Sequence, residues 1–373
     1  MGITRVANLT GLDTIGIPVV AVMRPNSKSL AVAQGKGLDL TAAKVSGLME
    51  AVETYHAENI AKALVLDSEA GLRALGANVI DVQRLPRVSC GSYHTDQRIL
   101  WIEGHEALTS RHVWVPFEVV HADYTVPLPT GSGAFLMTTN GLASGNHPLE
   151  ATSHALCEVV ERDAVTLWQH HGGVDQVECR LDLDTVEDDA CRSVLERFTA
   201  ADVSVGVWDV TSDIGISAFF CEIIDNSSSP WRSLGPTSGS GCHPCRGVAL
   251  LRALTEAAQA RLTVIAGSRD DLGVGTYLRG RDAELVSRCH AVMAQAAKRV
   301  FAKVPTHDGA TFTDDLAWEL ERLAGAGVGE VAVVDLTKRE FEIPVVRVIV
   351  PGLEGIADAP GYVAGHRARA RVS

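Results

Sequence analysis

Three predicted helices of this chain carry the same arrangement of polar residues on an otherwise apolar background. In each, the polar residues stand at positions i, i+4 and i+7, which places them along one narrow side of a helix. We call them the first stripe (Ser46, Glu50 and Glu53), the second stripe (His154, Glu158 and Glu161) and the third stripe (Arg252, Glu256 and Gln259). Apolar neighbours such as Val45, Leu48, Met49 and Val52 favour burial of the first helix. Because a buried carboxylate needs a cation or hydrogen-bond donors, the stripes point to bound metal or polyphosphate.

The solvated face of an amphipathic helix would explain any one stripe more simply, since Glu at helical spacing is usually exposed. Repetition argues against that explanation. Each stripe follows a glycine-bearing segment that we predict to be a loop, at residues 35–37, 140–146 and 239–241. Glycine lets a backbone approach a phosphate, and the next helix N-terminus presents free amides to an anion. We therefore predict a nucleotide site in which the glutamates converge on one magnesium–triphosphate pocket.

Composition describes a globular chain with no sign of a membrane or nucleic-acid protein. The 373 residues are 46% hydrophobic, enough for a single domain over residues 1–373 with room for compact subdomains. A formal net charge of −13 disfavours nucleic-acid binding, and the basic residues 366–371 belong to an expected flexible tail at 360–373. The apolar run at 17–23 is too short to span a bilayer. Eight scattered cysteines are typical of reduced thiols, so we expect a cytoplasmic protein.

The hydrophobic periodicity predicts strands and helices without strict alternation, which favours an α+β fold over a doubly wound sheet. The three striped helices are predicted at 41–57, from Pro148 to Gly172, and at 247–266. Further helices are predicted at 282–304 and 314–326, strands at 17–23, 30–32, 203–210, 216–224, 331–334 and 345–350, and a turn at 227–230.

Familiar catalytic and metal motifs are missing or incomplete. The sequence contains no G-x-x-x-x-G-K-[ST] phosphate loop and no kinase signature, so ATP would bind by another architecture. Residues Cys242 to Cys245 form one C-x-x-C pair without a second pair, which is too few ligands for a structural zinc site. Ser144 and Ser240 lie beside glycines but not in a G-x-S-x-G turn, which disfavours a serine hydrolase.

Three separated blocks of sequence resemble the YcaO family. They are Ser46–Glu53, then Asn146–Glu150 with Glu158–Asp163, then Arg252–Arg261, and the similarity extends from about Gly16 to Glu354. The resemblance implies an ATP-dependent enzyme that activates peptide-backbone amides. In that family a nucleophile adds to the amide carbon, ATP phosphorylates the oxygen, and phosphate leaves, giving an azoline, an amidine or a thioamide.

The resemblance also implies the site residues. ATP and magnesium ligands of the family carry over to Ser46, Glu50, Glu53, Asn146, Glu150, Glu158, Glu161 and Arg162. To these we add Lys36 for the nucleotide, and we expect Glu50, Glu53, Glu158 and Glu161 to hold metal. Arg162, Arg252, Glu256 and Gln259 are the catalytic candidates, and Arg261 and Asp271 are weaker candidates for the same pocket. One family position that is often serine is Ala143 here.

Residues 24–30, running into 34–37, look like the branch that works beside a TfuA-type partner and makes thioamides from a sulfide source. We therefore expect thioamide formation on a ribosomal peptide or protein, with a TfuA-type partner and a homodimer. Two alternatives stay open. One is an azoline-forming cyclodehydratase, which uses Cys, Ser or Thr of the substrate as the nucleophile. The other is a nucleotide-sensing subunit that catalyses nothing itself.

Overall fold

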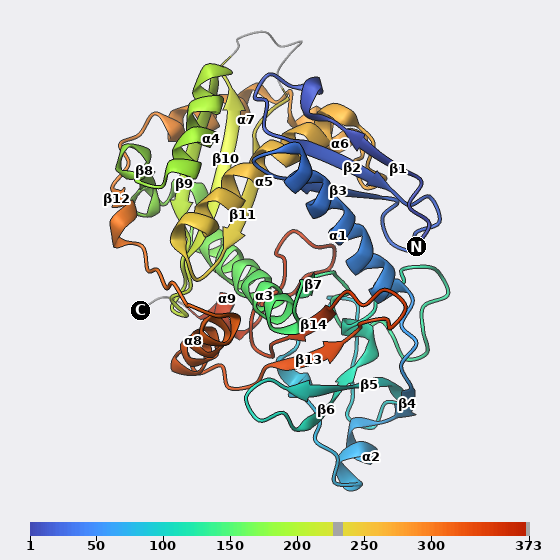
Figure 1. Ribbon diagram of the computed structural model, residues 1–373. Helices are drawn as coiled ribbons and strands as arrows, with labels where there is room; N and C mark the ends of the chain where they lie inside the picture. Colours follow the sequence, from blue (N-terminus) through green and yellow to red (C-terminus); the bar gives the residue numbers. More distant parts are fainter. Residues whose placement is uncertain (227–233, 371–373) are drawn as a thin grey trace. The chain divides into compact units, whose positions relative to one another are not determined.

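The computed structural model of the chain describes residues 1–226 and 234–370 (Figure 1). The turn predicted at 227–230 lies outside the described residues. The chain divides into two compact units, which we describe one at a time. Unit 1 comprises residues 1–51 and 168–308, and unit 2 comprises residues 52–167 and 309–373. Each unit combines helices with mainly antiparallel sheet, which confirms the predicted α+β class.

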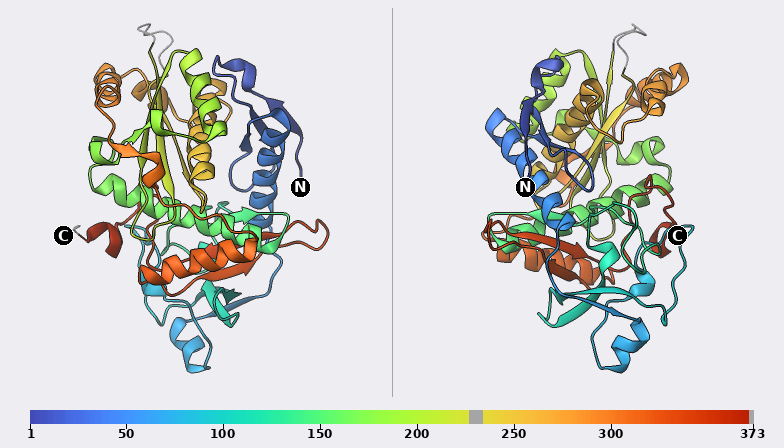
Figure 2. Two further views of the ribbon diagram at one scale, coloured as in Figure 1. Left: turned by 60° about the vertical axis from the view of Figure 1, so that its left-hand side comes forward. Right: turned by 90° about the vertical axis from the view of Figure 1, so that its right-hand side faces the viewer.

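Unit 1 contains two three-stranded antiparallel sheets, each followed by a long helix (Figures 1 and 2). The first sheet has the order β1-β2-β3, from β1 (Arg5–Asn8), β2 (Val19–Met23) and β3 (Val32–Lys36), and leads into α1 (Leu40–Glu58). The second has the order β11-β10-β9, from β9 (Val203–Asp209), β10 (Ala218–Asp225) and β11 (Thr237–Cys242), and leads into α5 (Arg246–Ala266). The other elements are α4 (Asp189–Ala200), α6 (Val274–Arg279), α7 (Ala283–Met293) and the parallel pair β8 (Leu181–Asp182) and β12 (Arg299–Val300).

The core of unit 1 lies where α4 and α5 cover the second sheet. Phe198 of α4, Phe219 of β10 and Leu254 of α5 are each 0% exposed and belong to one apolar cluster. Burying a large apolar side chain contributes about 1.5–3 kcal/mol, so this cluster fixes α5 on its sheet.

Unit 2 is built on a six-stranded sheet of order β4-β5-β13-β14-β7, with β6 added beside β5. Its strands are β4 (Leu64–Asp67), β5 (Ile99–Glu106), β6 (His112–Pro116), β7 (Leu142–Ser144), β13 (Ala332–Asp335) and β14 (Val345–Ile349). Its helices are α2 (Glu69–Ala74), α3 (Pro148–His170, in unit 2 through Leu167), α8 (Phe312–Gly325) and α9 (His366–Arg369). The hydroxyl of Ser153 on α3 donates to the buried carboxylate of Glu319 on α8, at 2.6 Å, and so ties the two helices together. Short 3-10 helices in the chain cover Thr10–Leu12, Val82–Arg84, Phe117–Val119, Gly173–Asp175, Val177–Cys179, Leu183–Thr185 and Phe301–Lys303.

The glycine-bearing segments at 35–37 and 239–241 are mostly strand, so the loops predicted there were wrong, whereas in the segment 140–146 only the middle is strand and Gly141 and Gly145 lie outside it. Residues 35–36 belong to β3, residues 142–144 form β7, and residues 239–241 lie inside β11. The glycines instead allow close packing of strand on helix. A Cβ on Gly35 would lie 2.1 Å from the Gly47 nitrogen of α1, and one on Gly241 would lie 2.2 Å from the Ala249 oxygen of α5. Side chains at these positions would force the helix off the strand.

Two other predicted elements need correction. The second strand runs over Val32–Lys36 and not over 30–32. The helix predicted at 282–304 ends at Met293, although Ala294 to Lys298 are good helix formers. Arg180 donates to the carbonyls of Val292, Met293 and Gln295, and Arg299 then pairs with Leu181 in a parallel bridge. Tertiary hydrogen bonds thus override local propensity at the end of α7.

The basic C-terminal segment makes defined contacts up to Ala370. Arg367 of α9 donates to the fully buried Asp163 of α3, with Nε 3.0 Å from Oδ1. The carboxylate of Glu354 accepts hydrogen bonds from the Tyr362 hydroxyl and from the amides of Gly365 and Ala368. This part of the expected tail is therefore held by two buried carboxylates of unit 2. None of the helices in the described ranges has the length and apolar character needed to cross a membrane.

Candidate nucleotide site

In unit 1 the backbone of a strand holds a glutamate of the helix that follows. The amide of Gln34 on β3 donates to Glu50 Oε2 at 3.2 Å, and the amide of Ser240 on β11 donates to Glu256 Oε1 at 3.3 Å. Both bonds join residues sixteen positions apart. The amide of Lys36 also donates to the Ser46 hydroxyl at 3.4 Å. The first and third stripes thus face their own strands, as the prediction of an interior-facing stripe required.

Lys36 links the first strand to the third stripe. Its ammonium lies 2.6 Å from Glu256 Oε2, and the two side chains are 22% and 30% exposed. Lys36 also acts on Glu50. The charge of Lys36 lowers the pKa of Glu50, whereas the charge of Glu256 raises the pKa of Glu50. The structure therefore gathers Lys36, Ser46, Glu50 and Glu256 within unit 1.

Glu50 is half-buried, and the burial of its carboxylate raises its pKa. The hydrogen bond from Gln34 and the charges of Lys36 and Arg269 oppose this shift without cancelling it. Arg269 is held in place by Asp271, with Nε 2.9 Å from Oδ1. A desolvated carboxylate beside a lysine and an arginine is the donor set expected where a divalent cation and phosphates bind together.

Sequence reasoning missed two residues of this cluster. Arg269 stands just after the end of α5, and no motif of the sequence marked it as a site residue. Gln34 is 2% exposed, its Oε1 accepts from the Thr263 hydroxyl, and its buried Nε2 has no hydrogen-bond partner among the described residues. An unpaired donor beside Glu50 fits a site whose ligand supplies an acceptor. No sequence signal marks such a residue, since its role arises from the pairing of β3 with α5.

In unit 2, Glu53 of the first stripe is held by β7. Both the amide and the hydroxyl of Ser144 donate to Glu53 Oε1, at 2.9 and 2.5 Å. Ser144 is 7% exposed, so water competes little for this contact. The serine was considered in the sequence only as a nucleophile and set aside. The neighbouring Ala143 is buried and has no polar side-chain atom to offer the carboxylate.

The start of α3 carries a second polar pair. The amide of Asn146 donates to Glu150 Oε2 at 2.7 Å, and its side-chain Nδ2 donates to the same oxygen at 3.1 Å. Asn146 lies two residues before Pro148, the first residue of α3, so these hydrogen bonds place the Glu150 carboxylate at the N-terminal end of the helix. Negative charge is favourable at this end of a helix, and a cation can use the remaining lone pairs.

The second stripe is only partly interior. Glu161 is 7% exposed and lies 3.3 Å from Arg162 Nη1, measured from its Oε1. Glu158 is half-buried, and its charge acts on the guanidinium of Arg347. His154 is exposed and does not share this environment.

The remaining candidates of α5 divide by role. Arg252 Nη1 donates to the Cys242 carbonyl at 3.1 Å. The pKa of His243 is lowered to about 4, first by the burial of its imidazole and then by the charge of Arg252. The backbone carbonyl of Gln259 accepts from the Thr263 hydroxyl. Arg261 instead forms a buried network with Asp13 and Asp225, at 2.9 Å each. These ion pairs give Arg261 a structural role within unit 1. Asp271 has a different partner, the guanidinium of Arg269.

Within the described part of the chain, no three His, Cys, Asp or Glu side chains are gathered so as to hold a metal ion by themselves. Mg²⁺ commonly takes one or two carboxylates and completes its octahedron with waters and substrate phosphates. Isolated carboxylates such as Glu50 and Glu53 are compatible with that mode, and they do not fit a metal cage made only of protein.

Comparison with known proteins decides the family. A family model described as YcaO cyclodehydratase, ATP- and Mg²⁺-binding, matches residues 34–354. The chain belongs to the YcaO family. ATP and Mg²⁺ are accordingly its cofactors, and it is an ATP-dependent peptide-modifying enzyme. The match covers all three stripes and the resemblance is confirmed.

Two relatives are similar over nearly the whole chain. A protein of Rhizobium leguminosarum bv. trifolii, described as lying in the tfuA 3′ region, is 39% identical over 95% of this chain and 84% of its own length. A protein of Methanothermobacter thermautotrophicus is 35% identical over 100% of this chain and 94% of its own length.

Solved structures share the fold. A heterocyclase in complex with substrate and cofactor superposes with a TM-score of 0.77 at 22% identity, covering 98% of this chain and 51% of that one. The YcaO protein of Methanopyrus kandleri, bound with AMPPCP and Mg²⁺, superposes with a TM-score of 0.71 at 23% identity, covering 98% and 90%. This chain thus spans about half the length of the heterocyclase.

Proposed function

We propose that this protein is a thioamide-forming member of the YcaO family, which replaces a backbone carbonyl oxygen of a ribosomal peptide or protein by sulfur. The observation that carries the enzymatic part is the desolvated Glu50 carboxylate, held by a strand amide beside Lys36 and Arg269. The sulfur chemistry draws its support from the 39% identical relative in a tfuA 3′ region.

ATP makes the amide oxygen a leaving group. In the proposed reaction hydrosulfide adds to the amide carbon, and the former carbonyl oxygen takes the γ-phosphoryl group while ADP leaves. The C–O bond then breaks, inorganic phosphate carries away that oxygen, and a C=S bond remains on the peptide. One ATP and one hydrosulfide are consumed for each thioamide, so atoms and charge balance.

We assign roles to the residues from their contacts. Glu50, Glu53, Glu158 and Glu161 supply carboxylate oxygens to Mg²⁺, each already oriented or partly desolvated in the protein. The nucleotide ligands are Lys36, Ser46, Asn146, Glu150 and Arg162. Arg162 and Arg252 have the fork geometry that stabilises charge on a transferring phosphoryl group.

Glu256 and Gln259 are assigned supporting roles. Glu256 accepts from the Ser240 amide and from Lys36, so it positions the lysine ammonium. Gln259 lies one turn further along α5, where its amide can reach the same cluster of unit 1.

Partners complete the proposal. A peptide or protein substrate and a TfuA-type partner protein accord with the relative in a tfuA 3′ region, and a cytoplasmic location accords with the free cysteines. The proposed homodimer rests on the family alone. All eight cysteines are free thiols, as thiols are in a reducing compartment.

Azoline formation is the second candidate, and the cyclodehydratase description of the family model favours it. A nucleotide-sensing subunit is the third. Mass spectrometry of a cognate peptide with enzyme, partner, Mg·ATP and sulfide separates them. Sulfur gained for oxygen supports the thioamide, water lost without sulfide supports the azoline, and an unchanged peptide with ATP bound but intact supports the sensor.

Three Glu→Gln variants, which each remove one negative charge, test the assignment of residues. Glu158→Gln and Glu161→Gln should abolish Mg²⁺-dependent ATP use. Glu321→Gln, on the exposed side of α8 in the same unit, removes a carboxylate away from the proposed ligands and should leave turnover unchanged. If all three variants keep the ATP affinity and turnover of the unmodified protein, the second stripe is not part of the site.

A further inference from the structure

Helix α3 has two sides with different tasks. The second stripe, with Glu158 and Glu161, carries the proposed metal ligands. Asp163 stands two residues after Glu161, which turns it by about 200° around the helix and away from the stripe. Thr166, three residues further, lies beside Asp163, and the two are 1% and 0% exposed, respectively. We call the side with Asp163 and Thr166 the back of α3, and it is packed inside unit 2.

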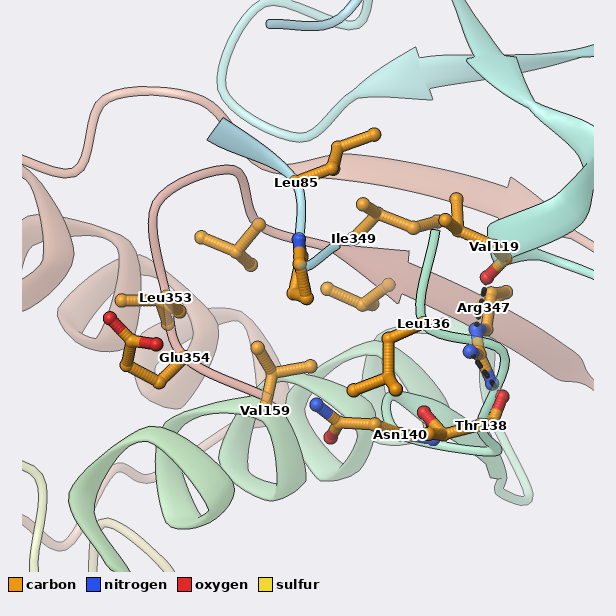
Figure 3. Close-up of a pocket in the computed structure, with 13 residues that line it drawn as sticks. Leu85, Val119, Leu136, Thr138, Asn140, Val159, Arg347, Ile349, Leu353 and Glu354 are labelled. Carbon is orange, nitrogen blue, oxygen red and sulfur yellow. Dashed lines mark hydrogen bonds between the residues drawn. The ribbon is translucent and has the colours of Figure 1, made fainter. Parts of the chain in front are cut away.

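Residues 354–368, which we call the clasp, bind the back of α3. The clasp begins after the turn that follows β14, where Figure 3 shows Glu354. The amide of Glu354 donates to Asp163 Oδ1 at 2.9 Å, and the Thr166 hydroxyl donates to the Gly355 carbonyl at 2.7 Å. Arg367 of α9 then donates to Asp163 with two nitrogens, since Nε lies 3.0 Å from Oδ1 and Nη2 lies 3.0 Å from Oδ2. Both ends of the clasp therefore contact α3.

Glu354 also closes the clasp on itself. Its carboxylate, in a residue 3% exposed, accepts from the Tyr362 hydroxyl at 2.6 Å and from the amides of Gly365 and Ala368 at 2.8 and 2.9 Å. A Cβ at Gly365 would lie 2.6 Å from Glu354 Oε1, so glycine leaves room for the carboxylate. Arg367 is thus presented to α3 by a segment that has its own internal support.

The ion pair between Arg367 and Asp163 restrains the rotation of α3. A guanidinium and a carboxylate joined by two parallel hydrogen bonds fix direction as well as distance. The two side chains are 14% and 0% exposed, so water competes little for the contact. A rotation of the helix would displace Glu161 and Arg162 together with Asp163, because all three belong to the same turn. Metal and phosphate ligands have to be held to within about 0.5 Å of their working geometry.

We propose that Arg367 is a positioning residue for nucleotide binding. Through Asp163 it sets the rotation of α3, and so it places Glu161 and Arg162 for Mg²⁺ and phosphate. Arg367 acts through Asp163 and not on the reacting atoms. The inference rests on the proposed function for the roles of Glu161 and Arg162, and it goes further by giving the clasp a part in ATP binding.

Calorimetry with the non-hydrolysable analogue AMPPCP and Mg²⁺, on the full chain without peptide, tests the proposal. Arg367→Ala removes both hydrogen bonds to Asp163 and should weaken binding about tenfold, as for the loss of an outer support of a metal ligand. Arg367→Lys keeps the charge without the planar fork, and should recover part of the affinity. Tyr362→Phe loosens the clasp without changing a charge and should weaken binding about threefold.

Two control variants separate positioning from stability. Arg369→Ala, on the exposed side of the same short helix, should leave the affinity for AMPPCP unchanged. Gly104→Ala of β5 should lower the unfolding temperature, because its Cβ would meet the Val333 oxygen at 2.7 Å, and should also leave the affinity unchanged. Thermal unfolding of each variant gives a temperature at which all are folded, and binding is measured there. If Arg367→Ala does not fold, Arg367→Lys and Tyr362→Phe decide the test.

Two results would overturn the proposal. In the first, the folded clasp variants bind AMPPCP as tightly as the unmodified protein does, whatever their unfolding temperatures. In the second, Gly104→Ala weakens binding as much as the clasp variants do, because affinity then follows stability alone.

Turnover separates the positioning role from the proposed function. If the clasp variants bind AMPPCP more weakly but the unmodified protein thioamidates no peptide, the proposed function fails and the positioning role stands. If peptide is thioamidated and the clasp variants keep full affinity, the positioning role fails and the function stands.

Discussion

The strand–helix pair that carries the first stripe and the pair that carries the third have the same construction and different chemistry. In both, a glycine of the strand packs against the helix, and a strand amide holds a glutamate sixteen residues further on. Glu50 is desolvated, whereas Glu256 is matched by Lys36 at 2.6 Å. Where the first stripe has Ser46 and Glu53, the third has Arg252 and Gln259. In our proposal one backbone arrangement presents a carboxylate to a cation in one case, and in the other it positions a lysine.

Glu50→Gln and Glu256→Gln should break this equivalence most clearly. We expect a loss of about 100-fold or more in kcat/KM for ATP with the first, because it removes a charge from the proposed metal. We expect about tenfold with the second, because it only frees Lys36. Peptide-dependent phosphate release measures both, with Glu196→Gln on the exposed side of α4 as control. Losses of equal size would show that both glutamates bind the metal.

Gly35→Ala and Gly241→Ala should destabilise unit 1 by similar amounts. Each added Cβ meets helix backbone at 2.1 or 2.2 Å, and such overpacking costs about 1–3 kcal/mol or more. Gly275→Ala is the control, since a Cβ there meets nothing within 4 Å. Urea unfolding of the three variants measures the difference. A cost at only one of the two sites would mean that the two pairs do not share their packing.

His243, which follows β11, gives the third-stripe pair a pH dependence in the mildly acid range. Burial and the charge of Arg252 lower its pKa to about 4, below the ordinary 6.5. Because the unfolded chain then binds more protons than the folded one, stability is fully present above pH 6.5 and falls as the pH drops towards 4. His243→Gln should flatten this part of a stability–pH curve, measured by urea unfolding at each pH. An unchanged slope would assign it to other groups.

Ser144→Ala should have the smallest effect and sharpens the contrast within the first stripe. The change removes the hydrogen bond from the residue 144 hydroxyl to Glu53 and keeps the hydrogen bond from the backbone amide of residue 144. We expect the Mg²⁺ concentration for half-maximal turnover to rise about fivefold, as for loss of one hydrogen bond of about 1 kcal/mol, with kcat at saturating Mg²⁺ preserved. Ala143→Ser cannot restore it, because neighbouring strand residues point to opposite faces. Rescue by that change would contradict the assigned contact.

The helices were predictable because their signal is local. Apolar periodicity, with Pro148 at the start of α3 and Gly267 after α5, predicted the three striped helices to within a few residues. The YcaO blocks named the candidate ligands, and Glu50, Ser46 and Lys36 do lie together in unit 1. The glycines of β3 and β11 were misread as loop residues, because glycine has the same sequence signature in a loop and at a tight strand–helix contact.

The sequence by itself determined which residues share a helix face, since that follows from 3.6 residues per turn and needs no partner. Only the tertiary structure decided what each face meets. Arg261 was a pocket candidate until Asp13 and Asp225 were brought to it from other elements, and Ser144 became the support of Glu53 only when β7 lay against α1. Desolvation, hydrogen bonding and charge depend on neighbours distant in the chain, so no local pattern encodes them.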